Sequence, residues 1–152
     1  MGKQAGRDSD PLIGFNFILD IKDGVMGMFT ECSGLGSENE VVEHKVVDEN
    51  GRELVQKIPG RMKFNDIVLK RGVTDRLDLW DWRAKVERGE MGEARTNGSV
   101  VMVDRNYEEL ARWNFTNGWP SKISGPALNA GSNDIAVEEI TIVHEGMERV
   151  KA

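Results

Sequence analysis

The sequence has few of the residue types that carry chemistry or that cross a membrane. Its single cysteine, Cys32, cannot form an intrachain disulfide, so a disulfide-stapled secreted scaffold is excluded. No apolar run approaches the roughly 20 residues of a transmembrane helix. The polar start, MGKQAGRDSDPLIG, lacks the apolar segment of a Sec signal peptide. We therefore expect the protein to be synthesised in the cytoplasm.

The chain also lacks a surplus of basic residues. It has 20 Lys and Arg against 26 Asp and Glu, and its formal net charge is −6, with the two signs interspersed. A nucleic-acid-binding surface or an anionic membrane partner would require a basic patch, so both are disfavoured. The length of 152 residues suits one domain. We expect a flexible N-terminal arm over residues 1–12 and one domain over residues 13–152.

Motifs for catalysis, cofactor binding or metal binding are missing. His44 and His144 have no Cys, His or Asp at metal-ligand spacing. Cys32 has no recognisable base, so a structural thiol is the better interpretation. The segment Gly34-Leu35-Gly36 lacks the remaining residues of a phosphate loop. The sequence therefore predicts no catalytic residue, no cofactor and no metal, and no enzyme.

What the sequence does contain is a series of strand patterns separated by turn signals. From Phe15 to Ile21, apolar and polar residues alternate, as in a half-buried strand, and Asp23-Gly24 follows as a hairpin turn. The expected strands cover residues 15–22, 25–32, 38–48, 52–58, 63–71, 98–104, 110–119 and 134–145. Residues 120–133 are expected to form a loop. The pattern predicts a mainly β fold, an antiparallel β-sandwich or barrel with one flanking α-helix.

The hairpin around Asn50-Gly51 is unusually long and carries a wholly polar tip. A turn centred on these two residues would place Val47 opposite Leu54 and Val46 opposite Val55. Pro59-Gly60 is expected to end the hairpin. We expect it to project from the domain, so that its apolar flanks require cover from another subunit.

The predicted helix, from Asp75 to Arg88, carries apolar residues on two opposite faces. Thr74 or Asp75 would cap its start, and Gly89 would follow its end. One face holds Leu77, Trp80 and Ala84, and the other holds Leu79, Trp82 and Val86. One face should pack on the core of the domain and the other on a second subunit, although a helix enclosed within one domain remains an alternative.

Several motifs in chain order resemble the tail-tube proteins of contractile phages and the related extracellular contractile injection systems. They are Phe15-Asn16-Phe17, residues 27–35 (GMFTECSGL), residues 58–60 (IPG) with Lys63-Phe64, residues 67–74 (IVLKRGVT) with residues 79–82 (LWDW), residues 113–120 (WNFTNGWP), and residues 135–140 (IAVEEI) with residues 144–146 (HEG). The resemblance covers roughly residues 15–146 and does not separate a phage tail from an injection particle.

This resemblance implies a hexameric ring of β-barrel-like subunits, with a fold shared by the type VI secretion tube protein. Rings would stack into a hollow tube inside a sheath protein, with baseplate and terminator proteins at its ends. Sheath contraction would drive the tube through a target envelope, and the lumen would carry effector proteins or DNA. Depending on the particle, its location would be cytoplasmic, membrane-anchored or released.

The resemblance also assigns roles to particular residues. Ring stacking falls to the hairpin residues Val46, Val47, Asp48, Glu49, Asn50, Gly51, Arg52, Glu53 and Leu54. Contact with the ring neighbour falls to the helix residues Leu77, Leu79, Trp80, Trp82 and Val86. A tube must release its cargo, so we expect a polar lumen and suggest Glu40, Glu43, Lys63, Asp66 and Lys70 as lining residues.

Two other functions remain open at this point. The four tryptophans could stack a small ligand in a monomeric β-barrel, although packing is their commoner role. A hydrolase without a recognisable motif is the third possibility.

Overall fold

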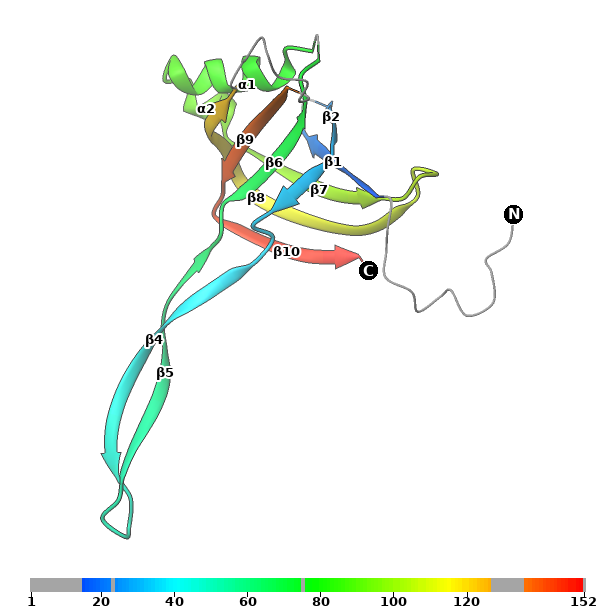
Figure 1. Ribbon diagram of the computed structural model, residues 1–152. Helices are drawn as coiled ribbons and strands as arrows, with labels where there is room; N and C mark the ends of the chain where they lie inside the picture. Colours follow the sequence, from blue (N-terminus) through cyan, green and yellow to red (C-terminus); the bar gives the residue numbers. More distant parts are fainter. Residues whose placement is uncertain (1–14, 23, 75, 127–135, 152) are drawn as a thin grey trace, which may run out of the picture.

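The computed structural model describes residues 15–22, 24–74, 76–126 and 136–151, and within them the chain forms ten strands and two helices (Figure 1). The strands are β1 Asn16–Ile21, β2 Gly24–Phe29, β3 Glu31–Ser33, β4 Ser37–Val47, β5 Glu53–Phe64, β6 Ile67–Gly72, β7 Thr96–Val103, β8 Glu109–Ser124, β9 Val137–Val143 and β10 Gly146–Lys151. The helices are α1 Asp78–Glu87 and α2 Met91–Ala94. The expected mainly β, antiparallel fold is confirmed, although at most eight strands were expected. The expected N-terminal arm lies outside the described residues.

Eight strands form one antiparallel sheet that folds over on itself. The strand order is β2-β1-β7-β8-β9-β6-β3, and β10 pairs with β8 beside this path. The first part of β8 pairs with β7 and β10, whereas its end pairs with β9. We call β2, β1, β7, β10 and the first part of β8 sheet A. The end of β8 with β9, β6 and β3 is sheet B. The core lies between these two halves.

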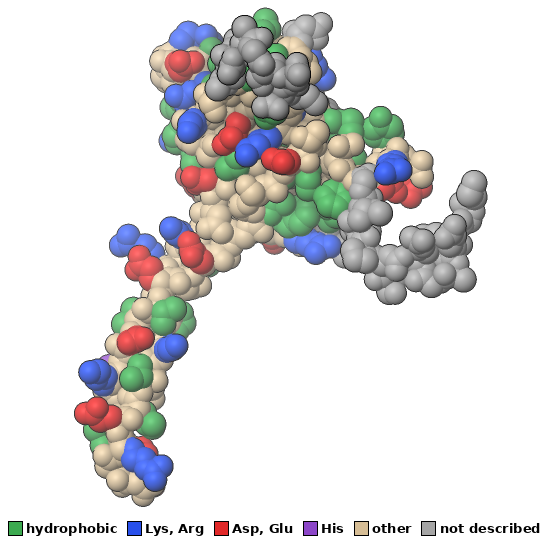
Figure 2. All heavy atoms as spheres, viewed as in Figure 1, with side chains coloured by type: hydrophobic (Ala, Val, Ile, Leu, Met, Phe, Trp, Pro, Cys, Tyr) green, Lys and Arg blue, Asp and Glu red, His purple; other side chains and the backbone are tan. Residues whose placement is uncertain are grey.

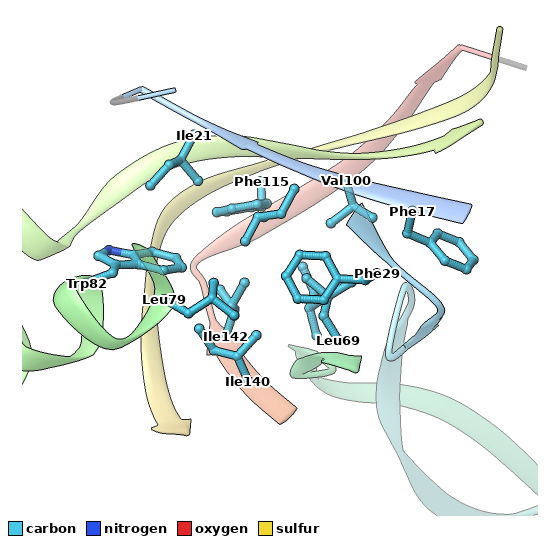
Figure 3. Close-up of a cluster of buried hydrophobic side chains, with 12 residues drawn as sticks. Phe17, Ile21, Phe29, Leu69, Leu79, Trp82, Val100, Phe115, Ile140 and Ile142 are labelled. Carbon is cyan, nitrogen blue, oxygen red and sulfur yellow. The ribbon is translucent and has the colours of Figure 1, made fainter. Parts of the chain in front are cut away.

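The core follows from strict alternation along the strands. In β1 the buried residues are Phe17, Leu19 and Ile21, as the sequence predicted, and β6 and β9 contribute alternate apolar residues in the same way. Figure 3 shows these side chains converging with those of α1. The cluster consists of Phe17, Leu19, Ile21, Phe29, Ile67, Leu69, Leu79, Trp82, Val100, Phe115, Ile140 and Ile142. Removing this apolar surface from water is the main stabilising term of the subunit.

The remaining two strands, β4 and β5, form a separate ladder that projects far from the body (Figure 1). We call residues 37–64 the arm. The projection matches the expectation, but the register is one residue off: Val46 lies opposite Leu54, and Lys45 lies opposite Val55. The loop has three residues rather than two, because Asp48 N–H donates to Arg52 O and Gly51, at φ +76°, closes a bulge.

Pro59-Gly60 does not end the arm, since β5 continues to Phe64. Pro59 lies opposite Val41 at an irregularity in the ladder. In a two-stranded ladder each strand is an edge, so a residue without an N–H group costs little there. The next strand therefore starts later than expected, at Ile67.

Helix α1 begins three residues later than predicted. Thr74 Oγ1 accepts the N–H of Arg76 in a local turn, which takes the predicted cap out of the helix. At the other end, Gly89 (φ +80°) donates to Val86 O, and Glu90 N–H donates to Lys85 O. These two bonds form the helix ending that was expected at Gly89.

Four further elements differ from the sequence-based expectation. The predicted return strand 25–32 is two strands, because the chain crosses from sheet A to sheet B at Thr30, whose N–H donates to Lys70 O. Strand β8 runs past Pro120 to Ser124, into the predicted loop, and the rest of that loop, residues 127–133, lies outside the described residues. Helix α2 and strand β10 were missed.

The β7–β8 connection repeats the loop of the arm tip. Asp104 Oδ1 accepts the N–H groups of Asn106 and Glu108, as Asp48 Oδ1 accepts those of Asn50 and Arg52. However, Tyr107 occupies the position equivalent to Gly51, and it has φ +62° and an exposed side chain.

Tyr107→Gly is therefore expected to stabilise the subunit by about 1 kcal/mol, because it relieves a left-handed conformation that disfavours side chains. Urea denaturation of the two proteins measures the change. Arg105→Gly, in the same loop, should give no gain, since the structure records no positive φ there. A Tyr107→Gly variant no more stable than the parent would contradict this account.

Candidate functional site

The arm is the most unusual surface of the molecule, because it exposes many large apolar side chains. Charged residues are interspersed among them along both strands (Figure 2). The exposed apolar residues are Val41, Val42, Val47, Leu54, Val55, Ile58 and Met62, between 43% and 67% exposed. An isolated two-stranded hairpin is marginally stable in water. A second molecule that covers the arm would therefore supply the missing apolar contacts.

The nine residues expected at the ring contact, 46–54, all lie at the far end of this arm. Val46 and Asp48 are half-buried and the other seven are exposed. Asp48 fixes the tip through its hydrogen bonds to the N–H groups of Asn50 and Arg52, at 2.9 and 2.8 Å. The tip thus presents a defined, polar shape.

The root of the arm is held by close backbone contacts. Gly36 O accepts the N–H of Asn65 at 3.0 Å, which joins the chain entering the arm to the chain leaving it. Gly34 (φ +83°) lies so close to the carbonyl of Asp66 that a Cβ atom there would be 1.8 Å from the oxygen. The arm therefore leaves the body through a tight crossing that requires glycine.

Helix α1 separates the two apolar faces that the sequence predicted. Leu79 and Trp82 are buried in the core of the subunit itself, where Trp82 Nε1–H donates to Ala94 O at 2.8 Å. The sequence left open which of the two apolar faces packs on the core, and this burial shows that it is the face with Leu79 and Trp82. Val86 is half-buried. Leu77, which precedes the helix, and Trp80 remain exposed, by 64% and 39%.

A buried ionic cluster fixes Trp80. Arg71 Nε donates to Glu138 Oε1 at 3.1 Å, and its Nη2 donates to Asp78 Oδ1 at 2.9 Å. The indole Nε1–H of Trp80 donates to Glu138 Oε2 at 2.8 Å. The guanidinium of Arg71 also lies 5.3 Å from the ring centre of Phe29. The start of α1 is thereby tied to sheet B, and the exposed part of the Trp80 ring is held in one orientation.

The sequence analysis did not name Arg71 and Glu138 as functional residues, although the sequence contains a signal for them. Arg71 continues the alternate set Ile67 and Leu69, and Glu138 precedes Ile140 and Ile142 in the same way. A charge on the core-facing set of each of two strands indicates a buried pair. Because β6 and β9 are neighbours, with Arg71 directly opposite Glu138, the two charges meet.

The five lumen candidates do not share one surface. Glu40 and Glu43 lie on the arm, and Lys63 lies near its root, 3.4 Å from Glu38. Asp66 lies between β5 and β6. Only Lys70 lies on the outer face of sheet B, where it is 3.8 Å from both Glu31 and Glu139.

The described residues hold no arrangement suited to metal or nucleophilic chemistry. No group of three or more His, Cys, Asp or Glu side chains among them could bind a metal. Burial raises the pKa of the Cys32 thiol to about 12, so it stays protonated at neutral pH. His44 lies on the exposed arm, while His144 Nε2 lies 3.2 Å from Asn65 O. Neither helix is long and apolar enough to span a membrane within the described ranges.

The sequence analysis left open a ligand site lined by tryptophans. A hollow of about 870 Å³ lies on sheet A. Its lining mixes the apolar residues Ile21, Phe115 and Met147 with polar ones. The polar residues include Ser99 and Asn114, with Ser99 Oγ donating to Asn114 Oδ1 at 2.6 Å. None of the four tryptophans is part of this lining.

Comparison with known proteins gives a match over nearly the whole chain. A family model described as T4-like virus tail tube protein gp19 matches residues 14–148. No curated protein sequence matches the chain.

Solved structures share the fold. The tube–sheath complex of an extracellular contractile injection system, PVC, in its extended state has a chain with a TM-score of 0.74 and 24% identity, covering 99% of this chain and 100% of that one. The sheath/tube terminator of PVC has a chain with a TM-score of 0.69 and 26% identity, covering 92% of this chain and 95% of that one. Hcp1 from Flavobacterium johnsoniae has a TM-score of 0.51 and 16% identity, covering 90% of this chain and 96% of that one. This is a likeness of fold alone.

Proposed function

This chain belongs to the T4-like virus tail tube protein gp19 family, and on that basis we propose that six copies close into a ring and that rings stack into a hollow tube. The protein is a structural tail-tube protein. The tube would stand inside a contractile sheath and be propelled when the sheath contracts, conveying effector proteins or DNA through its lumen. The family is one of structural proteins, and we propose no enzymatic activity.

The observation that carries the stacking proposal is the bare apolar arm. It extends well beyond the body, and seven of its large apolar residues remain 43–67% exposed among the described residues. A surface of this kind marks a protein–protein contact. We assign the arm to the contact between successive rings, with residues 46–54 at its tip.

The contact with the ring neighbour is assigned to the exposed side of α1. Leu77 and Trp80 are available there, and the hydrogen bond from Trp80 to Glu138 holds the indole in place before any partner arrives. A pre-oriented aromatic side chain loses little freedom on binding, which favours it as an anchor.

For the lumen we propose the outer face of sheet B. Lys70, Glu31 and Glu139 lie side by side on it with alternating charge. Thr141 and Lys122 continue the polar lining on the same face, opposite each other on β9 and β8. A lining of mixed charges that already pair with one another would hold a passing cargo weakly.

The proposed partners are the sheath protein around the tube and the baseplate and terminator proteins at its ends, as in the structures that resemble this chain. The proposed location is a phage tail or a phage-tail-like particle. Capsid genes beside its gene would indicate a phage, whereas sheath, baseplate and ATPase genes without them would indicate an injection system.

Deleting Asp48–Glu53 tests the stacking role of the arm. We expect the variant to fold, because the tip lies far from the core, and to form rings that do not stack. Electron microscopy and mass measurement distinguish rings from tubes, and circular dichroism checks the fold.

The matched control deletes Asp104–Glu109, which removes the same type of loop from the body rather than from the arm. Rings of this control should still stack. Tubes of normal length from the Asp48–Glu53 deletion would refute the role of the arm.

A further inference from the structure

Three asparagines in the chain are followed directly by glycine: Asn50, Asn97 and Asn117. This dipeptide is chemically labile, because glycine has no Cβ atom to keep its backbone nitrogen away from the asparagine side chain. The nitrogen can attack the Cγ atom of the asparagine wherever the chain is free to bring the two atoms together. The structure separates the three sites in this respect.

Asn97 and Asn117 are both held in sheet A. Asn97 Oδ1 accepts the N–H of Asn117 at 3.0 Å, and Asn117 Nδ2 donates to Glu145 Oε2. The glycines that follow them lie in the paired part of β7 and β8, two strands in the interior of the sheet. An attack at either site would require these side-chain bonds to break and central strands to separate, so both sites are protected by the fold.

Asn50 is exposed at the tip of the arm, and its carboxamide has no hydrogen-bond partner among the described residues. Gly51 N–H donates to Asp48 O at 3.1 Å, so this bond at the end of the ladder must open before the nitrogen can attack. No described atom lies within 4 Å of the Cβ position of Gly51, so no neighbour obstructs the movement. Because the arm has only two strands, its end opens far more readily than sheet A.

We propose that Asn50 is a site of spontaneous modification, at which the side-chain amide is lost and aspartate and isoaspartate form. In the first step Gly51 N loses its proton and bonds to Asn50 Cγ, while the bond from Cγ to Nδ2 breaks and ammonia leaves. The product is a five-membered succinimide ring. Water then opens the ring at Cγ, which gives aspartate, or at the backbone carbonyl carbon of residue 50, which gives isoaspartate. Water is consumed and ammonia is released, so the reaction requires no enzyme, oxidant or reductant.

Isoaspartate alters the tip because it adds one atom to the main chain between the nitrogens of residues 50 and 51. In the unmodified loop Asp48 Oδ1 accepts the N–H groups of Asn50 and Arg52, and Asp48 N–H donates to Arg52 O. A longer main chain between the two donors cannot keep all of these bonds in a three-residue loop. Both products also add a carboxylate to a tip that is already acidic. The tip therefore loses its defined shape and gains negative charge.

We infer that the modification limits how long a free subunit can stack, a step that rests on the stacking role of the arm in the proposed function. In a finished tube the tip would be covered by the next ring, where the loop can neither open nor admit water. Conversion then belongs to subunits and single rings that await assembly. Copies that stay unassembled for long are excluded from tubes.

Peptide mapping by mass spectrometry tests the modification. The parent chain is incubated at mildly alkaline pH, once folded and once unfolded in guanidinium chloride, and conversion is followed at all three Asn-Gly pairs. The three should convert at similar rates in the unfolded chain. In the folded chain Asn50 should convert while Asn97 and Asn117 stay intact, and isoelectric focusing should show a single added negative charge. Folded protein in which Asn50 is as inert as the other two would overturn the proposal.

Asn50→Gln is the matched variant, because its longer side chain would have to close a six-membered ring, which forms far more slowly. The charge shift of the folded protein should disappear in it. Aged parent rings should lose stacking in proportion to the modified fraction, whereas aged Asn50→Gln rings should stack as well as fresh ones. Electron microscopy counts the tubes.

The outcomes separate the modification from its effect and from the proposed function. Modified rings that stack normally, or tubes that are modified as fast as single rings, would overturn the limit on stacking and leave the modification standing. Fresh parent rings that never stack would overturn the stacking role in the proposed function, and the limit on stacking with it, while the mapping result at Asn50 would still decide the modification.

Discussion

Gly34→Ala should destabilise the subunit by about 2–5 kcal/mol and loosen the root of the arm. The positive φ at this position costs a side chain about 1–2 kcal/mol. In addition, the new Cβ would lie 1.8 Å from the carbonyl oxygen of Asp66, a backbone atom that cannot move aside as a side chain can. Forcing the two segments apart adds about 1–3 kcal/mol, as overpacking does elsewhere. Thermal and urea unfolding measure the loss.

Gly51→Ala provides the matched control. Gly51 has nearly the same backbone conformation, with φ +76° against +83°, but nothing lies within 4 Å of the Cβ position. It should lose only the conformational part, about 1–2 kcal/mol. The difference between the two variants isolates the close contact at the root. Equal losses would show that the contact between Gly34 and Asp66 is unimportant.

Arg71→Leu should cost about 3–5 kcal/mol, because it leaves the carboxylate of Glu138 buried without its cationic partner. For a domain of this length, that corresponds to a fall in melting temperature of roughly 10 °C. The variant also removes the hydrogen bond from Arg71 to Asp78 that ties α1 to sheet B. The melting temperature by circular dichroism gives the first readout.

Lys70→Leu is the control on the same strand. Lys70 and Glu139 are half-buried and Glu31 is exposed, so solvent still screens these pairs and the loss should stay within about 1 kcal/mol. Combining Arg71→Leu with Glu138→Leu should regain much of the stability, because no unpaired charge then remains buried. A double variant as unstable as Arg71→Leu alone would contradict the argument that the cost lies in the stranded carboxylate.

The elements that the sequence predicts well are those specified by local pattern. The alternation of Phe17, Leu19 and Ile21 identifies the core face of β1, and the polar, turn-forming tip identifies the projecting arm. The helix ending at Gly89 follows from its positive φ. In each case the residues near in sequence supply the deciding interactions, and the prediction is confirmed.

The errors arise where distant segments decide. Strand β5 continues through Pro59 because the arm has no third strand that would need its N–H group. The break at Thr30 depends on β6, forty residues away, which draws β3 into sheet B. The late start of α1 is the exception, because there a local hydrogen bond at Thr74 competes with the helix. The sequence places one tryptophan on each of two similar apolar faces of α1. Which of the two faces the core is decided by packing against distant strands, which the sequence does not show.

The candidate site divides in the same way. The tip residues were identified because turn chemistry is local, whereas the cluster of Arg71, Glu138 and Trp80 requires the pairing of β6 with β9. The lumen residues were the weakest prediction, since the sequence alone does not reveal which strands share a face. Lys70 alone of those five lies on the face that we now assign to the lumen.

The straight passage of the arm into sheet B has a mechanical consequence. The strands β4 and β5 leave the body next to β3 and β6, and they point along one common direction over a long ladder (Figure 1). In a stacked tube, an axial pull on the tip would be shared by both strands along their covalent backbones down to the root, rather than peel the ladder apart bond by bond. A tube built from such arms would transmit a sudden axial force without its rings separating.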